Sequence, residues 1–197
     1  ADGWDLVQWG TLHPGDIKYV DQNGDNKMDS NDEVVIGWPG NYPLMTFGFN
    51  PNASWKGFDL SLFFQGSAMI SNSIYNFQTS PFRNNNSNAD YEYYNNRWTP
   101  DNQDAKYPRA YTNPPPNTTQ NSDFWVKSTA YMRLKNATFG YTLPRTVLNK
   151  IKIDQIRVYV ASQNLWTISN LKFMDPEMVS DTGYPNMKSF TLGANVT

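Results

Sequence analysis

The sequence has no cysteine and only one histidine, His13, among its 197 residues. The absence of cysteine excludes disulfide bonds, thiolate zinc sites and cysteine nucleophiles together. A single histidine leaves few pairs of a nucleophile and a base, and no spacing among the 18 acidic residues singles out a glycosidase-type carboxylate pair. The composition therefore predicts that the chain is not an enzyme.

Clusters of basic residues and long apolar runs are missing as well. The 16 Lys and Arg residues are outnumbered by 18 Asp and Glu residues, which gives a net charge of −2. No nucleic-acid partner is expected, because such binding needs a concentrated basic surface. No apolar run approaches the roughly 20 residues of a membrane-spanning helix. The first residues carry no signal segment and read as mid-chain sequence, so we expect a piece of a longer protein.

Aromatic residues and turn residues are abundant instead. Aromatic side chains make up 15% of the sequence, although its mean hydropathy is that of a polar chain. This combination is typical of β-structure with solvent-exposed faces. Between prolines and glycines, apolar and polar residues alternate with the period of strands. Such alternation occurs in residues 46–55, 58–65, 156–161 and 190–197. A turn at Lys56-Gly57 joins the first two of these segments and predicts a hairpin.

A further strand candidate, residues 131–144, has a mixed pattern. Arg133 and Lys135 share their parity with Phe139 and Tyr141. In a regular strand, residues of equal parity lie on the same face. Simple alternation therefore assigns no consistent apolar face to this segment.

Two architectures fit long strands with one apolar and one polar face. A soluble sandwich buries the apolar face in a core, whereas a transmembrane barrel turns that face to lipid and lines its lumen with the polar face. The segments approach the length of about 9 to 11 residues that a tilted transmembrane strand needs, which favours the barrel. Aromatic residues near strand ends are then expected to form girdles at the membrane surfaces: Tyr42, Trp55, Trp125, Tyr141 and Trp166. The alternative is a secreted, calcium-stabilised β-sandwich that binds carbohydrate.

An acidic stretch, DQNGDNKMDSND at residues 21–32, matches most positions of a calcium-loop pattern. Asn26 replaces the expected glycine, although asparagine tolerates positive φ. The flanking segments, residues 17–20 and 33–37, read as strands rather than helices. Two interpretations remain open, a structural Ca²⁺ without a catalytic role or a solvated turn rich in Asp and Asn. The predicted metal-site residues are Asp21, Asn23, Asp25, Lys27, Asp29 and Asp32.

Six segments carry a resemblance to a known family: GDIKYVDQNGDNKMDSNDEVVIG, FGFNPNASWKGFDLSLFFQGS, RWTPDN, YMRLKNATFGYTLP, IRVYVASQNLWTIS and SFTLGANVT. Together they resemble the C-terminal part of SusC/RagA-type TonB-dependent outer-membrane transporters of Bacteroidetes. The resemblance covers essentially the whole chain, in the family's order. The sequence departs from the family at its end, because it stops at Thr197 where an aromatic residue usually follows. This departure also predicts a fragment.

The resemblance implies an all-β fold in which this chain supplies the C-terminal, antiparallel strands of a large barrel of about 22 strands. It implies an outer-membrane location with lipid around the barrel, and import of oligosaccharides or peptides. It also implies a SusD-like surface lipoprotein as partner, and energy from TonB through an N-terminal region that the chain lacks. The chain is then divided into a strand and loop with the acidic turn (1–41), the hairpin (42–68), a long extracellular loop (69–124) and the terminal strands (125–197).

The long loop is rich in asparagine, proline and aromatic residues. Aromatic faces stack on sugar rings and amide side chains hydrogen-bond hydroxyl groups, so the loop is a candidate surface for the substrate or the lipoprotein. The opposite interpretation is that the aromatic residues pack the loop onto itself, because a loop of this length needs an internal core. The candidate residues are Tyr91, Tyr93, Tyr94, Trp98, Tyr107 and Tyr111.

Overall fold

The computed structural model describes residues 8–40, 42–75, 88–149, 153–172, 174–178 and 184–197. The chain forms two compact units. The first, here called the loop unit, comprises residues 1–38 and 71–127, and the second, the sheet unit, comprises residues 39–70 and 128–197. Stretches that are far apart in the sequence therefore contribute to each unit.

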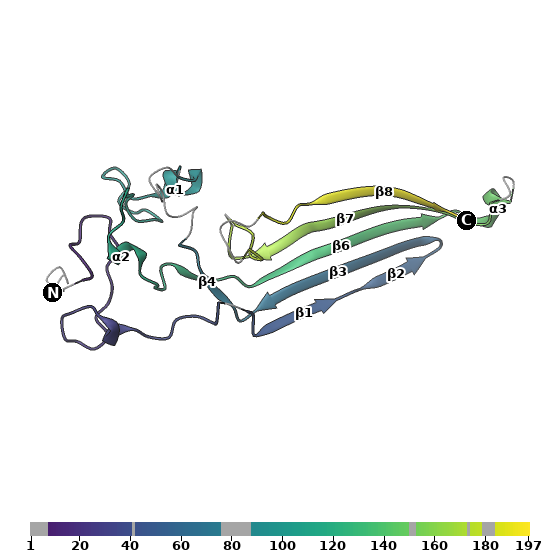
Figure 1. The fold of residues 1–197 in the computed structure, drawn as a ribbon. Coiled ribbons are helices and arrows are strands. Elements are labelled where there is room, and N and C mark those ends of the chain that lie inside the picture. Colours follow the sequence, from purple (N-terminus) through teal and green to yellow (C-terminus); the bar gives the residue numbers. More distant parts are fainter. Residues whose placement is uncertain (1–7, 41, 76–87, 150–152, 173, 179–183) are drawn as a thin grey trace. The chain divides into compact units, whose positions relative to one another are not determined.

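The sheet unit is built on a six-stranded antiparallel sheet (Figure 1). The strand order is β1, β3, β6, β7, β8, and β2 also pairs with β3. The strands are β1 (Met45–Phe49), β2 (Asn52–Trp55), β3 (Phe58–Ala68), β6 (Tyr131–Thr142), β7 (Ile156–Ser169) and β8 (Ser189–Val196). β3, β6 and β7 have 11, 12 and 14 residues, enough for a tilted strand to cross a membrane. The predicted all-β, antiparallel fold is confirmed.

The β2–β3 hairpin turns where the sequence predicts it. Lys56 and Gly57 have φ angles of 49° and 90°, the left-handed conformation that a two-residue hairpin turn of type I′ requires. A Cβ on Gly57 would lie 2.9 Å from the carbonyl oxygen of Thr142, so this glycine also allows β6 to approach closely. The turn pairs Trp55 with Phe58 and thereby sets which residues of the hairpin share a face.

One face of the sheet is apolar and exposed. Directly opposed residues on neighbouring strands share a face, and one apolar row runs from β3 to β8 through Leu60, Phe139, Val160 and Leu192. A second row contains Phe58, Tyr141, Val158 and Ala194. We call these two rows, with Phe190, the apolar band. Leu192 is 85% exposed and Phe190 is 69% exposed, an arrangement that soluble monomers rarely show over a contiguous surface.

The other face is polar, and a β-bulge decides which residues of β6 reach it. The register between β3 and β6 shifts at Lys135, which becomes an extra residue on β6. Arg133 therefore lies opposite Gln65 on the polar face, whereas Phe139, which has the same parity, lies opposite Leu60 in the apolar band. The mixed alternation of this strand is the sequence signature of the bulge.

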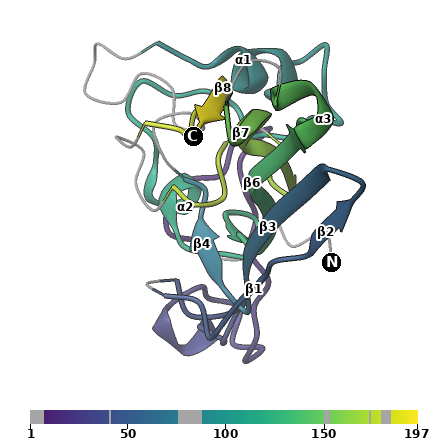
Figure 2. The same ribbon diagram turned by 90° about the vertical axis from the view of Figure 1, so that its right-hand side faces the viewer.

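The sheet is curved and open. Seen along the strands, β2, β3, β6, β7 and β8 follow one another on a curve (Figure 2). β1 and β8 lie at the ends of the strand order, so the barrel is not closed within the part of the chain that the structure describes. A short helix, α3 (Arg145–Leu148), lies in the connection between β6 and β7. Among the described residues, no helix is long and apolar enough to cross a membrane.

The loop unit has short elements only, among its described residues. They are the 3-10 helix η1 (Ser30–Asp32), the helices α1 (Tyr91–Asn96) and α2 (Pro116–Thr119), and the paired strands β4 (Ser71–Ser73) and β5 (Val126–Ser128). The predicted strands at residues 17–20 and 33–37 are wrong, because neither segment is a strand in the structure. In the first of them, the backbone N–H and carbonyl of Tyr19 bond the Gln8 side chain instead of a neighbouring strand.

A small aromatic core holds the loop unit together. Trp125, Tyr93 and Tyr107 are 1%, 2% and 3% exposed. The Trp125 indole donates to the Thr118 carbonyl at 2.8 Å, and the Tyr93 hydroxyl donates to the Pro108 carbonyl at 2.9 Å. Each ring is thus buried with its polar group satisfied. The prediction that Trp125 belongs to a membrane girdle is therefore wrong, because this residue is a core residue of the loop unit.

Candidate functional site

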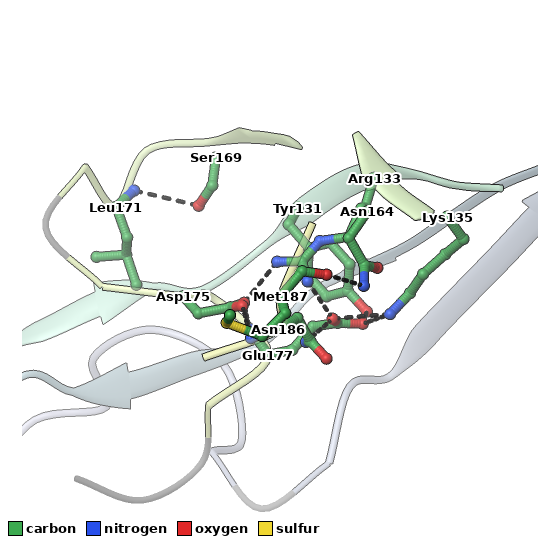
Figure 3. Close-up of polar contacts among 10 residues, drawn as sticks. All are labelled: Tyr131, Arg133, Lys135, Asn164, Ser169, Leu171, Asp175, Glu177, Asn186 and Met187. Carbon is green, nitrogen blue, oxygen red and sulfur yellow. Dashed lines mark hydrogen bonds and ion pairs between the residues drawn. The ribbon is translucent and has the colours of Figure 1, made fainter. Parts of the chain in front are cut away.

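An ion cluster lies on the polar face, where the β7–β8 connection folds back onto the strands (Figure 3). Arg133 lies 2.5 Å from Asp175 through Nη2 and 2.7 Å from Glu177 through Nη1. Lys135, the bulge residue, lies 2.8 Å from Glu177. The Tyr131 hydroxyl donates to Glu177 at 2.5 Å. We define the ion cluster as these five residues.

Backbone and amide groups of the connection complete the cluster. The backbone N–H groups of Glu177 and Asn186 each donate to Asp175 at 3.0 Å. The Asn186 side chain donates to Glu177 at 2.5 Å. Asn164 on β7 donates to the Met187 carbonyl at 3.0 Å. Together with the ion pairs, these bonds hold residues 174–178 and 184–188 of the connection against β6 and β7.

Burial makes the ion cluster more costly to break than a surface pair. The Arg133 side chain is 4% exposed. Burial alone would raise the pKa of Asp175, but the Arg133 guanidinium and the backbone N–H groups of Glu177 and Asn186 hold this pKa below its usual value. Removing one partner of a buried pair costs about 3–5 kcal/mol. The cluster therefore favours one placement of the connection.

A pocket of about 330 Å³ opens beside the ion cluster. Its wall comes from β6, from β7 and from the connection, and it includes Arg133, Asn164, Lys172, Asp175, Asn186 and Lys188. Charged groups at the wall of a pocket give a bound solute both orientation and selectivity. The pocket thus offers a hollow with charged and polar groups on the polar face.

A second charge pair lies on the polar face, farther along the strands. Arg157 donates to Asp59 through Nε at 2.9 Å and through Nη2, the bidentate geometry of a strong ion pair. A Cβ on Gly140 would lie 2.5 Å from Nη2 of Arg157, so a glycine on β6 lets the pair bridge that strand. On β8, a Cβ on Gly193 would lie 2.5 Å from the Tyr159 ring. Glycines thus make room for large polar side chains on this face.

The acidic stretch in the loop unit folds around its own backbone. Asp21 accepts from the N–H groups of Gly24 and Asn26 at 2.6 and 2.8 Å. Asn26 has a φ of 63°, a conformation that asparagine tolerates well. Backbone N–H groups, first that of Asp29, hold the pKa of Asp32 below its usual value. The stretch is therefore an ordered turn in which carboxylates replace backbone acceptors.

The predicted Ca²⁺ site in this stretch stays a prediction. The described residues contain no group of three or more His, Cys, Asp or Glu side chains placed to hold a metal ion. Lys27 pairs with Asp29 at 3.0 Å, and Asp29 also caps η1. Hydrogen bonds and this ion pair thus give the acidic side chains partners within the stretch.

The aromatic candidates of the long loop fall into two groups. Four have partners within the loop unit: Tyr93 and Tyr107 in its core, Trp98 against Gly15, and Tyr111 donating to Asp16. Tyr91 and Tyr94 on α1 are 84% and 56% exposed. The guanidinium of Arg97 lies 4.2 Å from the centre of the Tyr94 ring. A contact surface for substrate or lipoprotein stays a prediction. Tyr91 and Tyr94 are the candidates whose side chains remain exposed.

Sequence reasoning missed the ion cluster. Its acidic members lie 42 residues beyond their basic partners, and no local pattern joins them. The available signal was the unexplained placement of Arg133 and Lys135 among apolar residues of one strand. Two cations in such a place require carboxylate partners from elsewhere in the chain.

The chain is similar to known receptors over nearly its whole length. It is 33% identical to TonB-dependent receptor P3 of Formosa agariphila, over 95% of this chain and 19% of that protein. It is 27% identical to TonB-dependent receptor SusC of Bacteroides thetaiotaomicron, over 93% of this chain and 18% of that protein. The chain thus spans about a fifth of the length of these relatives. No family model matches.

Solved structures agree with these relatives. The RagAB peptide importer in its open-open state matches with a TM-score of 0.64 at 26% identity. The match covers 90% of this chain and 20% of that chain. The closed-closed state of the same importer matches to the same extent.

An antiparallel sheet with an apolar, exposed outer face and a charged inner face defines a wall segment of an outer-membrane barrel. The sheet and the relatives together show that the chain belongs to the SusC/RagA-like TonB-dependent transporters. The chain forms a segment of such a transporter. The resemblance read from the sequence and the outer-membrane location are both confirmed.

Proposed function

We propose that the chain forms the C-terminal wall of an importer that carries oligosaccharides or peptides across the outer membrane, with energy from TonB. The apolar band is the observation that carries the proposal. In outer-membrane barrels the outward face is apolar and the inward face polar, and this sheet is divided in the same way. A secreted β-sandwich is not favoured, because it would bury the side chains that are exposed here.

The lengths of the connections support an orientation. The β2–β3 turn is short, whereas the connection from β3 to β6 and the one from β7 to β8 are long and leave from the opposite end of the sheet. Outer-membrane barrels have short periplasmic turns and longer extracellular loops. We therefore assign the ion cluster and the start of the long loop to the extracellular end, where a solute enters.

The relatives support the proposed classes of substrate and partner. The solved structures belong to a peptide importer, and SusC is a TonB-dependent receptor. For this chain we propose an oligosaccharide or peptide substrate, a SusD-like surface lipoprotein as partner and no catalytic role. Tyr91 and Tyr94 would offer exposed aromatic faces to either the substrate or the lipoprotein.

Deletion of the gene in the source bacterium tests import. The deletion strain and the parent would be grown on a panel of oligosaccharides and of peptides as carbon sources. We expect the deletion to abolish growth on one class of substrate, and the intact gene to restore it. Equal growth of both strains on every substrate would contradict the proposed function.

Purification tests the partner separately. The full-length transporter would be tagged and isolated from outer membranes in mild detergent. We expect one surface lipoprotein to co-purify in equal amount, and to be lost when its own gene is deleted. A transporter that imports substrate but purifies alone would contradict the partner while leaving the import function in place.

A further inference from the structure

We propose that the pocket beside the ion cluster binds an oxoanion group, a carboxylate or a sulfate, of the imported solute. The inference rests on the proposed function, because a solute meets this pocket only if the polar face borders the import path. Three features support it: an unpaired donor on a buried arginine, an excess of positive charge among the described lining residues, and a wall that combines polar and apolar groups.

The first feature is the guanidinium of Arg133. Its Nη2 pairs with Asp175, but Nε is buried and has no hydrogen-bond partner in the described part of the chain. Nη1 lies 2.7 Å from Glu177 but does not make a hydrogen bond of good geometry. Buried donors are rarely left unpaired in native proteins, and an unpaired one costs about 1–3 kcal/mol. Arg133 lines the pocket, so a guanidinium with unmet hydrogen-bonding capacity lies beside the space that a ligand would fill.

The second feature is the charge of the wall. Three cations line the pocket, Arg133, Lys172 and Lys188, and among the described lining residues Asp175 is the carboxylate that opposes them. Both lysines are exposed. Asp175 already has Arg133 and two backbone N–H groups as partners, so it does not neutralise the lysines. Glu177 also contacts Arg133, and Lys135 balances its charge. The positive charge of the two lysines therefore remains and favours an anion.

The third feature is the rest of the lining. Asn164, Thr167 and Ser169 on β7 offer amide and hydroxyl groups, and Leu171 and Met174 offer apolar surface. A volume of about 330 Å³ lies at the small end of ligand pockets, which suits one sugar ring or one amino-acid residue. An acidic sugar or the carboxylate end of a peptide would place its anion at the cations and its ring or side chain on the apolar wall.

The test uses the full-length transporter in detergent and three sugars of equal ring size. Glucuronate carries a carboxylate, glucose 6-sulfate carries a sulfate, and glucose carries neither. Binding would be measured by calorimetry and by ligand-observed NMR. We expect one or both anionic sugars to bind about tenfold more tightly than glucose or better, since a charge-assisted hydrogen bond is worth about 1.5–3 kcal/mol. The anionic sugar that binds shows whether the pocket accepts a carboxylate, a sulfate or both.

A double variant, Lys172→Gln with Lys188→Gln, tests the pocket itself. We expect it to lose about tenfold or more in affinity for the anionic sugar while glucose binding stays the same. Both lysines are exposed, so the fold is expected to persist, and hydrogen exchange of residues 170–178 would check this. The matched control is Lys56→Gln, which removes an exposed lysine from the β2–β3 turn at the other end of the sheet and is expected to leave binding unchanged.

Two results would overturn the inference. One is that glucose and the two anionic sugars bind with equal affinity, or that none of the three sugars binds. The other is an anion affinity that the double variant and the Lys56 control change equally. Because binding needs no import, failure here together with normal growth of the parent strain on its substrate contradicts the pocket alone. Failure of the growth test contradicts the proposed function instead.

Discussion

The loop unit and the sheet unit place similar side chains in opposite surroundings. In the loop unit Trp125 is 1% exposed and its indole donates to a carbonyl. In the sheet unit Trp55 is 68% exposed and Leu192 is 85% exposed. An apolar side chain needs an apolar environment, but the chain need not supply it. The loop unit covers its rings with its own residues, whereas the sheet leaves its apolar band exposed.

This difference implies different sources of stability. The loop unit depends on a few buried aromatic residues, because its described helices and strands are short. The sheet depends on paired backbone along β3, β6 and β7, because unpaired N–H and carbonyl groups are costly in a lipid environment. Substitutions of the same chemistry should therefore have different effects in the two units.

The largest effect is expected for Trp125→Ala in the loop unit. Removal of a buried Trp costs about 3–5 kcal/mol, so hydrogen exchange of the loop unit in the full-length transporter should accelerate strongly. The matched control is Trp55→Ala, which removes an exposed ring and should leave exchange of the sheet nearly unchanged in detergent. Equal acceleration in the two variants would contradict the contrast between the units.

Arg133→Met tests whether the polar face depends on its ion cluster. The substitution leaves Asp175 and Glu177 partly buried without their main cation, at a cost of about 3–5 kcal/mol. Because much of that cost can be relieved by release of the connection, we expect faster hydrogen exchange in residues 170–178 and 184–188, with β7 still protected. Arg133→Lys keeps the charge and should show a smaller effect. Unchanged exchange in the methionine variant would show that other bonds hold the connection.

Leu192→Arg tests the apolar band, and the adjacent residue of β8, Thr191, provides the comparison on the polar face. A cation on the lipid face near the membrane midplane costs about 2–4 kcal/mol. We expect less folded transporter in outer membranes, measured by its heat-dependent mobility in gels. Thr191→Arg places the same residue on the polar face and should fold at the normal level. A larger defect for the Thr191 variant would reverse the assignment of the two faces.

Acid should loosen the ion cluster but not the sheet. The pKa of Asp175 is lowered in the folded protein, so its contribution to stability is fully present above the ordinary carboxyl pKa of about 3.9. That contribution is lost as the pH falls through the lower folded value. Hydrogen exchange of the β7–β8 connection should therefore rise at strongly acidic pH, while Asp175→Asn shows less pH dependence there. A connection equally protected at all pH values would contradict this role of Asp175.

The smallest effect is expected from calcium. If the acidic stretch holds a structural ion, calorimetry on the full-length transporter should detect binding at millimolar Ca²⁺, and Asp25→Asn should weaken it. The hydrogen bonds that already occupy Asp21 and Asp32 predict weak binding at most. No heat of binding at millimolar calcium would leave the solvated turn as the interpretation.

The parts of the fold that follow a regular period were predictable from the sequence. The turn at Lys56-Gly57 and the facing of Leu60 and Val160 follow from turn chemistry and from alternation, and the structure has both. The placement of Arg133 was not predictable in this way. A single extra residue in β6 reverses the parity on either side of it, and alternation alone cannot show where such a residue lies.

Non-local contacts account for the rest. The ion cluster forms because the β7–β8 connection folds back onto β6, which depends on contacts 42 residues apart. The choice between a packed and an open aromatic residue in the long loop depends on the same kind of contact. Tyr93 and Tyr94 are adjacent in the sequence, yet one is buried and the other is exposed, because one side of a short helix meets the core and the other does not.

The most direct test asks which residues of β8 touch lipid. The chain has no cysteine, so spin labels can be attached to single cysteines at Thr191, Leu192, Ala194 and Asn195 in a full-length transporter without other cysteines. In lipid bilayers, oxygen dissolved in the membrane should relax the labels at Leu192 and Ala194 and spare those at Thr191 and Asn195. Equal relaxation at all four positions, or the opposite alternation, would contradict a sheet whose apolar band faces lipid.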